Sequence, residues 1–241
     1  GWMPIFPMWN SYTSAMVGDH ANTILGDAYL KGFDINIDKA YPYMRKNALE
    51  VSEGEDFKNG KGRRGMKSYL QYGYIPLEDS IKEAFHKNEQ TSRTLEYSMT
   101  DFVLSKVAEK YGKTEDAQIL AKHAKNYQLV FDNESKSMRG RYINGTWSSD
   151  YNPTARASYL TEGTPLQHMW FVPQDVPGLF DLIGDKKLVH EKLDELFSTG
   201  EYWHANEPCH HIPYLYNFLG DYTATQKTVK NIMASEYNNF D

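Results

Sequence analysis

The 241-residue sequence contains a single cysteine, Cys209. One cysteine excludes a disulfide within the chain and any zinc site built from several cysteines, and it leaves the redox compartment open. The sequence also lacks a run of 18 apolar residues, and residues 1–10 lack the basic segment and apolar core of a signal peptide. We therefore expect no membrane-spanning helix and no uncleaved signal peptide in these residues.

Basic residues are neither in excess nor clustered. Lys and Arg number 26 against 32 Asp and Glu, which gives a net charge of −6. Nucleic acids and anionic membranes attract concentrated positive charge, so neither is an expected partner. The motifs Gly-x-Ser-x-Gly, Gly-x-Gly-x-x-Gly and His-Glu-x-x-His are also absent. Their absence disfavours acyl transfer, nucleotide binding and zinc-dependent hydrolysis.

Aromatic residues, by contrast, are abundant, with 18 Tyr, 5 Trp and 11 Phe making up 14% of the chain. Aromatic faces stack on sugar rings, but they also fill cores and protein interfaces. The excess therefore suits a carbohydrate site without requiring one. The length suits one sizeable core, and we expect residues 1–241 to form a single unit.

Apolar residues recur at steps of three and four over most of the chain, which predicts helices. In the first half we expect helices over residues 12–32, 38–51, 92–112 and 114–131, with a long polar loop over residues 52–65. Pro42 fits the second helix only in its first turn. Thr114 is the predicted cap of the fourth helix. Because a short connection joins the last two helices, residues 92–132 should form an antiparallel helical hairpin.

Helical periodicity stops at residues 138–152, where Asn144-Gly145 predicts a small hairpin or an ordered loop. It resumes over residues 164–184, 185–197, 212–219 and 223–237, which gives about eight helices and almost no strand. The expected fold class is all-α, with antiparallel helical hairpins arranged as a bundle, a solenoid or an α/α toroid. No repeat of fixed period occurs, which disfavours the solenoid.

Glu162 stands between aromatic residues and a turn, in the run Tyr159-Leu160-Thr161-Glu162-Gly163-Thr164-Pro165. A Glu in that setting is expected to be poorly solvated. Desolvation raises the pKa of a carboxyl group, which allows a general acid to keep its proton near neutral pH. The alternative is that Glu162 caps the helix that follows it.

Residues 206–211 read Asn-Glu-Pro-Cys-His-His and gather an amide, a carboxylate and two imidazoles. The oxygen atoms of Asn206 and Glu207 suit calcium, whereas His210 and His211 are adjacent, point to different faces and cannot easily share a zinc ion. The alternative is an ordinary helix start, with Glu207 in the first turn and both histidines bonded to nearby backbone.

Asp19 and His20 fall within the predicted helix over residues 12–32. His20 lies on its apolar face and Asp19 beside the edge of that face. A histidine in this position is commonly a core residue with its hydrogen bonds satisfied, and the alternative is a polar group of a site.

Five segments, in this order, together resemble glycoside hydrolase family 92, the calcium-dependent exo-acting α-mannosidases. They are residues 16–21 (Met-Val-Gly-Asp-His-Ala), residues 95–98 (Leu-Glu-Tyr-Ser) with Asp101, residues 138–141 (Met-Arg-Gly-Arg), residues 159–178 and residues 206–217. The resemblance spans nearly the whole chain. It implies that the helical hairpins form part of an (α/α)6 toroid.

The resemblance also implies a function, an inverting mannosidase that removes terminal α-linked mannose from glycans. An α-1,2 linkage and a periplasmic or extracellular location are expected with it. It makes Glu162 the acid that protonates the departing glycosidic oxygen, and calcium the cofactor, held by Asn206 and Glu207. It further implies a set of substrate-binding residues, namely Asp19, His20, Trp170, His210 and His211.

The sequence departs from the family pattern at Thr164, Leu166, His168 and Gln174, which bears on substrate preference. The family's base comes from an acidic segment expected soon after Asp241, and an N-terminal β-sandwich domain is also missing. We therefore expect an incomplete catalytic domain, inactive alone, that needs both missing regions. Alternatives are a non-catalytic mannoside-binding or assembly module of the same fold, and a helical-toroid enzyme of another carbohydrate class, such as a lyase.

Overall fold

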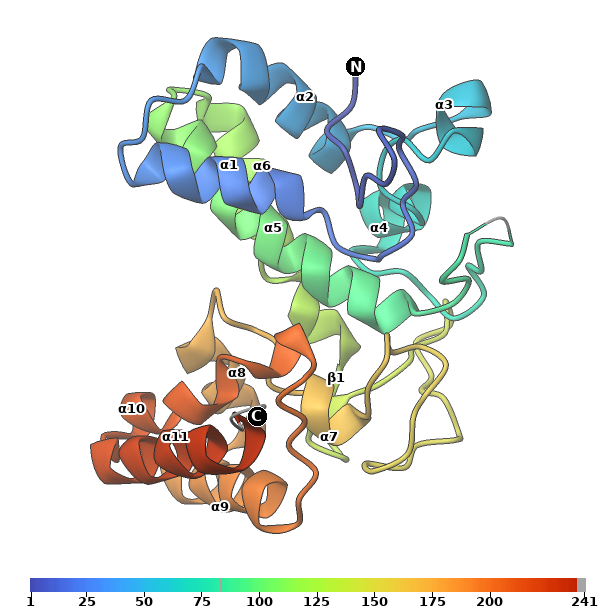
Figure 1. The fold of residues 1–241 in the computed structure, drawn as a ribbon. Helices are drawn as coiled ribbons and strands as arrows, with labels where there is room; N and C mark the ends of the chain where they lie inside the picture. The colour runs from blue at the N-terminus through green and yellow to red at the C-terminus, as the bar shows by residue number, and fades with distance from the viewer. Residues whose placement is uncertain (83, 238–241) are drawn as a thin grey trace. The chain divides into compact units, whose positions relative to one another are not determined.

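A computed structural model describes residues 1–82 and 84–237 as a mainly helical protein with one short antiparallel strand pair (Figure 1). These residues form eleven α-helices and three 3-10 helices, which confirms the all-α class. The count exceeds the prediction because several predicted helices are broken into shorter pieces and because two short helices were not predicted. One of them, over Gly54–Lys58, lies inside the stretch 52–65, so the prediction that this stretch is a loop throughout is wrong. None of the described helices combines the length and the apolar character that crossing a bilayer requires.

By its internal contacts the chain divides into two compact units. Unit 1 comprises Gly1–Val130, Arg139–Ser149 and Ser158–Thr161, and unit 2 comprises Phe131–Met138, Asp150–Ala157 and Glu162–Asp241. Each unit therefore contains segments that are distant in the sequence. Residues 238–241, which precede the expected base segment, lie outside the described residues.

Unit 1 is built around one long helix, α5, which contacts α1, α2, α6 and η1 (Figure 1). Its elements are α1 His20–Leu30, α2 Ile37–Leu49, α3 Gly54–Lys58, α4 Met66–Tyr72, α5 Gln90–Lys110, α6 Thr114–His123 and the 3-10 helix η1 Asn126–Val130. The core of this unit joins α2, α5 and α6 through buried apolar side chains: Met44, Ala48, Leu104, Val107, Ala108 and Leu120. Burial of a leucine such as Leu104 is worth about 2–5 kcal/mol relative to alanine.

The predicted helical hairpin over residues 92–132 is confirmed in its essentials. α5 ends at Lys110, the backbone turns at Gly112 with a φ of 76°, and α6 packs back against α5. The prediction that Thr114 caps α6 is wrong. Lys113 occupies the cap position and Thr114 is the first helical residue. α6 is also shorter than predicted, because the chain passes into η1 after His123.

Two other helices of unit 1 differ from the prediction. α1 begins at His20 instead of residue 12, and the residues before it are irregular, with positive φ at Trp9, Asn10 and Ser14. Pro42 lies inside α2 and not in its first turn. A proline there cannot donate the helical hydrogen bond, so α2 forms although one ladder position is lost.

Unit 2 carries the strand pair and the remaining helices. β1 Phe131–Asp132 pairs with β2 Ser137–Met138, with Phe131 opposite Met138. The helices are α7 Pro165–His168, α8 Val176–Ile183, α9 Lys186–Ser198, the 3-10 helices η2 Glu207–Cys209 and η3 Ile212–Tyr214, α10 Tyr216–Leu219 and α11 Tyr222–Glu236. The predicted helix over residues 164–184 is thus two helices with a non-helical link between them, and the one over 212–219 is divided likewise.

The hairpin predicted near residues 138–152 is found in part. The paired strands lie slightly earlier, at residues 131–138, and residues 138–152 contribute a single bridge between Arg141 and Trp147. The turn between those two residues contains Gly145, whose φ of 86° favours glycine.

Side chains of aspartate start the helices of unit 2. Asp175, Asp185 and Asp221 each accept a hydrogen bond from a backbone N–H of the first turn, at α8, α9 and α11 respectively. Such caps satisfy donors that the helix itself leaves free.

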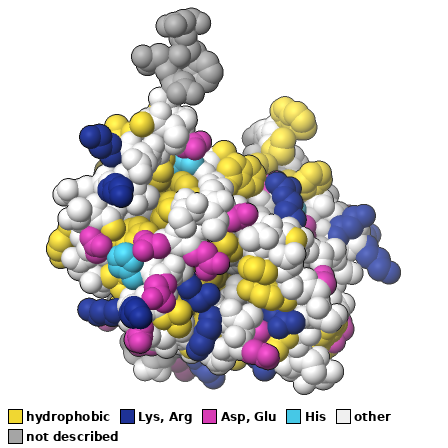
Figure 2. Space-filling model, turned by 90° about the horizontal axis from the view of Figure 1, so that it is seen from below, with side chains coloured by type: hydrophobic (Ala, Val, Ile, Leu, Met, Phe, Trp, Pro, Cys, Tyr) yellow, Lys and Arg dark blue, Asp and Glu magenta, His cyan; other side chains and the backbone are white. Residues whose placement is uncertain are grey.

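On the face drawn in Figure 2, acidic and basic side chains are interspersed and not gathered by sign.

Candidate active site

The loop that carries Glu162 ends in a complete capping box at α7. Gln167 donates its backbone N–H to the Thr164 hydroxyl at 3.4 Å, and the Gln167 side-chain oxygen accepts the Thr164 N–H at 3.0 Å. The start of the helix is therefore already satisfied by Thr164. The alternative in which Glu162 caps that helix is wrong.

Glu162 itself is exposed, while Thr161 and Gly163 on either side are buried. Its backbone adopts the left-handed conformation, with a φ of 53°, which is uncommon for a residue other than glycine. The prediction that the carboxyl group of Glu162 is poorly solvated is therefore wrong in this structure. The apolar neighbours in the sequence bury their own side chains, as Trp170 does completely, and do not cover Glu162.

Asn206 links the second predicted segment to Glu162 within unit 2. The Asn206 side chain is 5% exposed and its Nδ2 donates to the backbone oxygen of Glu162 at 3.4 Å. Asn206 precedes η2, and Glu207 is the exposed first residue of that helix. The structure therefore brings the predicted acid and the two predicted metal ligands to neighbouring turns of one unit, although 44 positions separate Glu162 from Asn206.

Both histidines of this segment bond to backbone carbonyls. His210 Nε2 donates to the His204 oxygen at 2.7 Å, and its ring stacks on the His204 ring at 4.7 Å. His211 Nε2 donates to the Trp170 oxygen, also at 2.7 Å. The contacts foreseen in the helix-start alternative are thus present. They fix the orientation of both rings, and that is compatible with a site as well as with a structural role.

Burial lowers the pKa of His211, opposed by its hydrogen bonds to the backbone of Trp170 and Pro208. Trp170, which provides the carbonyl, has no exposed surface, and its indole Nε1 bonds to no described residue. The ring of Trp170 therefore belongs to the core of unit 2. The contact of Trp170 with His211 is made by its backbone carbonyl.

Asp19 and His20 lie in unit 1, with exposures opposite to those expected. Asp19 has no exposed surface, and its carboxylate accepts hydrogen bonds from Arg63 Nε at 3.0 Å, from Asn22 and from Asn47. Burial raises the pKa of Asp19, and the charge and hydrogen bond of Arg63 oppose that rise. His20, the first residue of α1, is exposed. The expectation that His20 lies on the buried face of the helix, with Asp19 at the edge of that face, is therefore wrong.

Two buried charged side chains of unit 1, Arg63 and Glu96, were not among the site residues predicted from the sequence. Arg63 is buried between Asp19 and Asp101, and its Nη1 donates to Asp101 Oδ1 at 2.7 Å. Glu96, in the first half of α5, is 7% exposed, and burial raises its pKa while His20 opposes the rise. A charged residue between Leu95 and Tyr97 on a helix with an apolar stripe was the available signal for Glu96. Arg63, in a polar glycine-rich stretch, gave none.

Three of the residues that depart from the family pattern are structural. Thr164, Leu166 and His168 are all buried in and around α7. His168 also lies so close to Gly163 that a Cβ at that position would come within 2.5 Å of its Nε2. These three changes therefore bear on how the Glu162 loop is packed.

The described residues contain no group of three or more His, Cys, Asp or Glu side chains arranged to hold a metal. Asn206 and Glu207 nevertheless present the hard oxygen donors that calcium prefers. Because Nδ2 of Asn206 donates a hydrogen bond to the backbone oxygen of Glu162, the side-chain oxygen of Asn206 is the atom that could bind a cation. The donor types fit calcium, and the number of side chains falls short of the six to eight oxygens that calcium takes.

Unit 2 therefore brings together an exposed glutamate and, through the bond from Asn206 to its backbone, a segment that carries a second carboxylate and two histidines held by carbonyls. The sequence pattern of the glycosyl hydrolase family 92 catalytic domain matches residues 1–241, so the chain belongs to that family. The resemblance seen in the sequence is thereby confirmed.

Similar proteins agree with this membership. An uncharacterized secreted glycosidase of Arthroderma benhamiae is 26% identical over 264 residues, covering 99% of this chain and 34% of that protein. The family GH92 α-mannosidase BT3965 of Bacteroides thetaiotaomicron, solved with mannoimidazole, superposes with a TM-score of 0.87 at 31% identity, covering 99% of this chain and 32% of that one. The inverting mannosidase BT2199 of the same organism gives 0.83 at 26% identity, covering 94% and 33%. The chain thus spans about a third of the length of these relatives.

Proposed function

We propose that this chain contributes the general acid and part of the sugar pocket of a glycoside hydrolase that removes terminal α-linked mannose from glycans. Family membership and the two mannosidases of known structure support the class of reaction. The observation that carries the proposal is local. Glu162 is exposed on a left-handed turn, its capping role is taken by Thr164, and its backbone is bonded by Asn206.

In the proposed reaction Glu162 protonates the glycosidic oxygen as the bond to the anomeric carbon breaks. The relative BT2199 is an inverting mannosidase, and inversion requires a second carboxylate about 6.5–9.5 Å from the acid, with a water between them. We assign that base to no residue of this chain. A sugar bound over Glu162 would displace the water around its carboxyl group, which supplies the dry surroundings that the exposed loop lacks.

We assign calcium to Asn206 and Glu207 within this proposal. The ion would take the amide oxygen of Asn206 and the carboxylate of Glu207, and its other ligands would be water, backbone carbonyls or sugar hydroxyls. Calcium supplies a fixed positive charge that orients sugar hydroxyls. Asn206 is suited to coupling that ion to the acid, because its amide nitrogen holds the backbone of Glu162.

The remaining assignments follow from the same placement. His210 and His211 are oriented by carbonyls, and we propose that they line the mannose site. Trp170 and Asp19 have no exposed surface, so we propose that they act by holding His211 and the start of α1. The Arthroderma relative is a secreted glycosidase, which supports a proposed periplasmic or extracellular location, and an α-1,2 preference is part of the proposal.

The test is Glu162→Gln in the full-length protein. Its activity is measured on α-linked mannose disaccharides, whose leaving group is a sugar, and on 4-nitrophenyl α-mannoside. Loss of a general acid lowers the rate by about 10²–10⁴-fold. We expect that loss on the disaccharides and a much smaller one on the nitrophenyl substrate, whose leaving group needs no proton. Equal losses on both substrates, or full activity, would remove Glu162 from the acid role. Mannoside binding without turnover by the wild type would instead identify a non-catalytic module.

A further inference from the structure

His190 lies between two carboxylates in unit 2, and the proposed reaction does not use it. Its Nδ1 lies 3.1 Å from Asp194 Oδ2, and its Nε2 lies 3.0 Å from Asp221 Oδ2. His190 and Asp194 belong to α9, whereas Asp221 caps the start of α11. One imidazole ring therefore joins two helices of the same unit.

Both ring nitrogens of His190 must carry a proton to make these two bonds. An ionised carboxylate only accepts hydrogen bonds, and a neutral imidazole has one N–H and one lone pair. Asp221 is ionised near neutral pH, because hydrogen bonds from the backbone of Ala224 and from His190 lower its pKa. The arrangement therefore fits the imidazolium cation, since a neutral ring would turn a lone pair toward one of the carboxylates.

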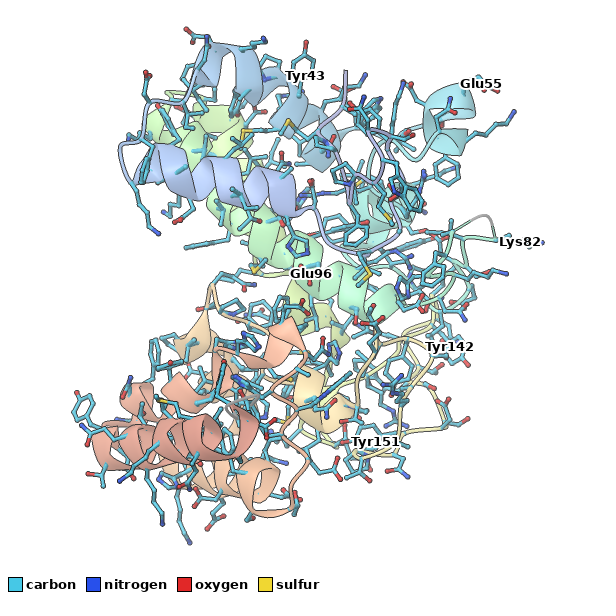
Figure 3. The ribbon with its side chains drawn as sticks, viewed as in Figure 1. Tyr43, Glu55, Lys82, Glu96, Tyr142 and Tyr151 are labelled. Carbon is cyan, nitrogen blue, oxygen red and sulfur yellow. The ribbon has the colours of Figure 1, made fainter. Side chains whose placement is uncertain are left out.

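A third helix takes part in the same cluster. The Tyr216 hydroxyl of α10 donates to Asp194 Oδ1 at 2.9 Å, and the Tyr216 ring meets the His190 ring edge-on, with centroids 5.2 Å apart. α10 packs against both α9 and α11 (Figure 3). α8 also packs against α9, but in the described part of the chain no hydrogen bond or ion pair joins His190 to Asp181, the charged residue of α8. Two carboxylates and one phenol thus surround the imidazole.

We propose that Asp194, His190 and Asp221 form a pH-sensitive clasp, which fastens the start of α11 to α9 while His190 is protonated and loosens when the ring loses its proton. Asp221 ties the clasp to the helix end, because its Oδ1 accepts the backbone N–H of Ala224 at 2.8 Å. Loss of the proton removes the positive charge that both carboxylates share and leaves them a single N–H. A charge-assisted bond between the two helices is thereby lost or weakened.

The direction of the pH dependence follows from the same contacts. The hydrogen bond to Asp221, aided by Asp194, raises the pKa of His190 above its usual value of about 6.5, while burial opposes the rise. A histidine whose pKa is raised on folding contributes stability that is complete below the unfolded pKa and is lost as the pH passes the folded pKa. The clasp is therefore closed at pH 6 and opens on the alkaline side. The three side chains are 34–57% exposed, so the effect is modest and local to α11.

The experiment is hydrogen exchange of α11 peptides in the full-length protein between pH 6 and pH 9, with each rate divided by the intrinsic rate at that pH. His190→Gln removes the titrating group and keeps a polar side chain. Asp221→Asn removes one carboxylate and keeps the cap, because asparagine caps a helix as well as aspartate does. Glu191→Gln is the matched control, since it breaks an exposed pair with Lys187 on the same helix.

We expect the protection of α11 in the wild type to fall about threefold from pH 6 to pH 9, the size of effect that a partly exposed pair produces. His190→Gln should be independent of pH and as weakly protected as the wild type at pH 9. Asp221→Asn should show a smaller fall than the wild type, and the control should match the wild type.

A wild type whose protection does not change with pH would overturn the proposal, as would a His190→Gln that falls as steeply as the wild type. Loss of the pH dependence in the Glu191→Gln control would equally count against His190 as its source. If His190→Gln fails to fold, the wild-type profile and Asp221→Asn decide, because the first must fall and the second must fall less.

Discussion

Replacing Arg63 by methionine removes a cation that two buried carboxylates share. Arg63 Nε lies 3.0 Å from Asp19 and Nη1 lies 2.7 Å from Asp101, and all three side chains have no exposed surface. The guanidinium also lies over the Tyr97 ring, 4.7 Å from its centroid. Methionine keeps the length and apolar contacts of the arginine stem, so the change isolates the loss of charge and hydrogen bonds.

The expected cost is large because the charges that remain are buried. Removing one partner of a buried ion pair costs about 3–5 kcal/mol, and here two carboxylates lose their cation. We therefore expect a loss of at least about 3 kcal/mol at pH 7, a substantial part of the roughly 5–15 kcal/mol by which a domain is stable.

The loss should depend on pH in a defined direction. Burial already raises the pKa of Asp19 and Arg63 opposes the rise, so without Arg63 the pKa rises further. A carboxyl group whose pKa is higher in the folded state takes up a proton on folding, so its penalty is absent below the unfolded pKa and grows as the pH rises. The deficit of Arg63→Met relative to the wild type should shrink as the pH is lowered from 7 toward 4.

The assay is urea unfolding followed by circular dichroism, with hydrogen exchange of peptides from α1 and α5. Exchange is needed because two units need not unfold together. Glu109→Gln, which removes an exposed pair with Lys106, is the control and should cost less than about 1 kcal/mol. A deficit of the same size as the control at pH 7, or one that stays constant with pH, would refute the account of the Arg63 network.

Three smaller effects follow from the same structure. Thr164→Ala removes the cap of α7 and should cost about 1 kcal/mol in chemical unfolding, whereas an unchanged midpoint would count against the capping box. Asp221→Asn should lower the pKa of His190 measured by NMR, because the hydrogen bond from His190 to Asp221 is the main cause that raises it; no change would contradict that assignment. Asn206→Ala should abolish any calcium-dependent rise in melting temperature of the full-length protein, and a persisting rise would place the ion elsewhere.

The fold was predictable where local pattern and tertiary packing agree. The α5–α6 hairpin follows from long apolar periodicity and a glycine stop, and α5 was placed to within two residues, whereas α6 ends at His123, well before the predicted end at residue 131. The start of α1 was not, because the apolar residues before His20 pack as an irregular segment. No local signal distinguishes these two uses of the same residue types.

The exposure of site residues was less predictable than their identity. Asp19 can be buried because Arg63, 44 positions away, neutralises it, and Glu162 is exposed on a left-handed turn. Both outcomes depend on partners or dihedral angles that adjacent residues do not specify. The order of the segments, in contrast, carried the family resemblance without any knowledge of burial.

Within the loop that carries Glu162, Thr164 caps α7, so Glu162 is not needed for that structural role. No described residue bonds to the Glu162 carboxylate, yet this residue occupies a backbone conformation that costs a non-glycine residue about 1–2 kcal/mol. The bond from Asn206 holds the backbone of Glu162 and not its carboxylate, and a strained residue whose side chain supports no described contact is a reason to suspect function. Glu162→Gln should therefore melt at the wild-type temperature while Thr164→Ala melts lower. If Glu162→Gln melts as low as Thr164→Ala, the carboxylate supports the fold, and a loss of activity in that variant would no longer identify an acid.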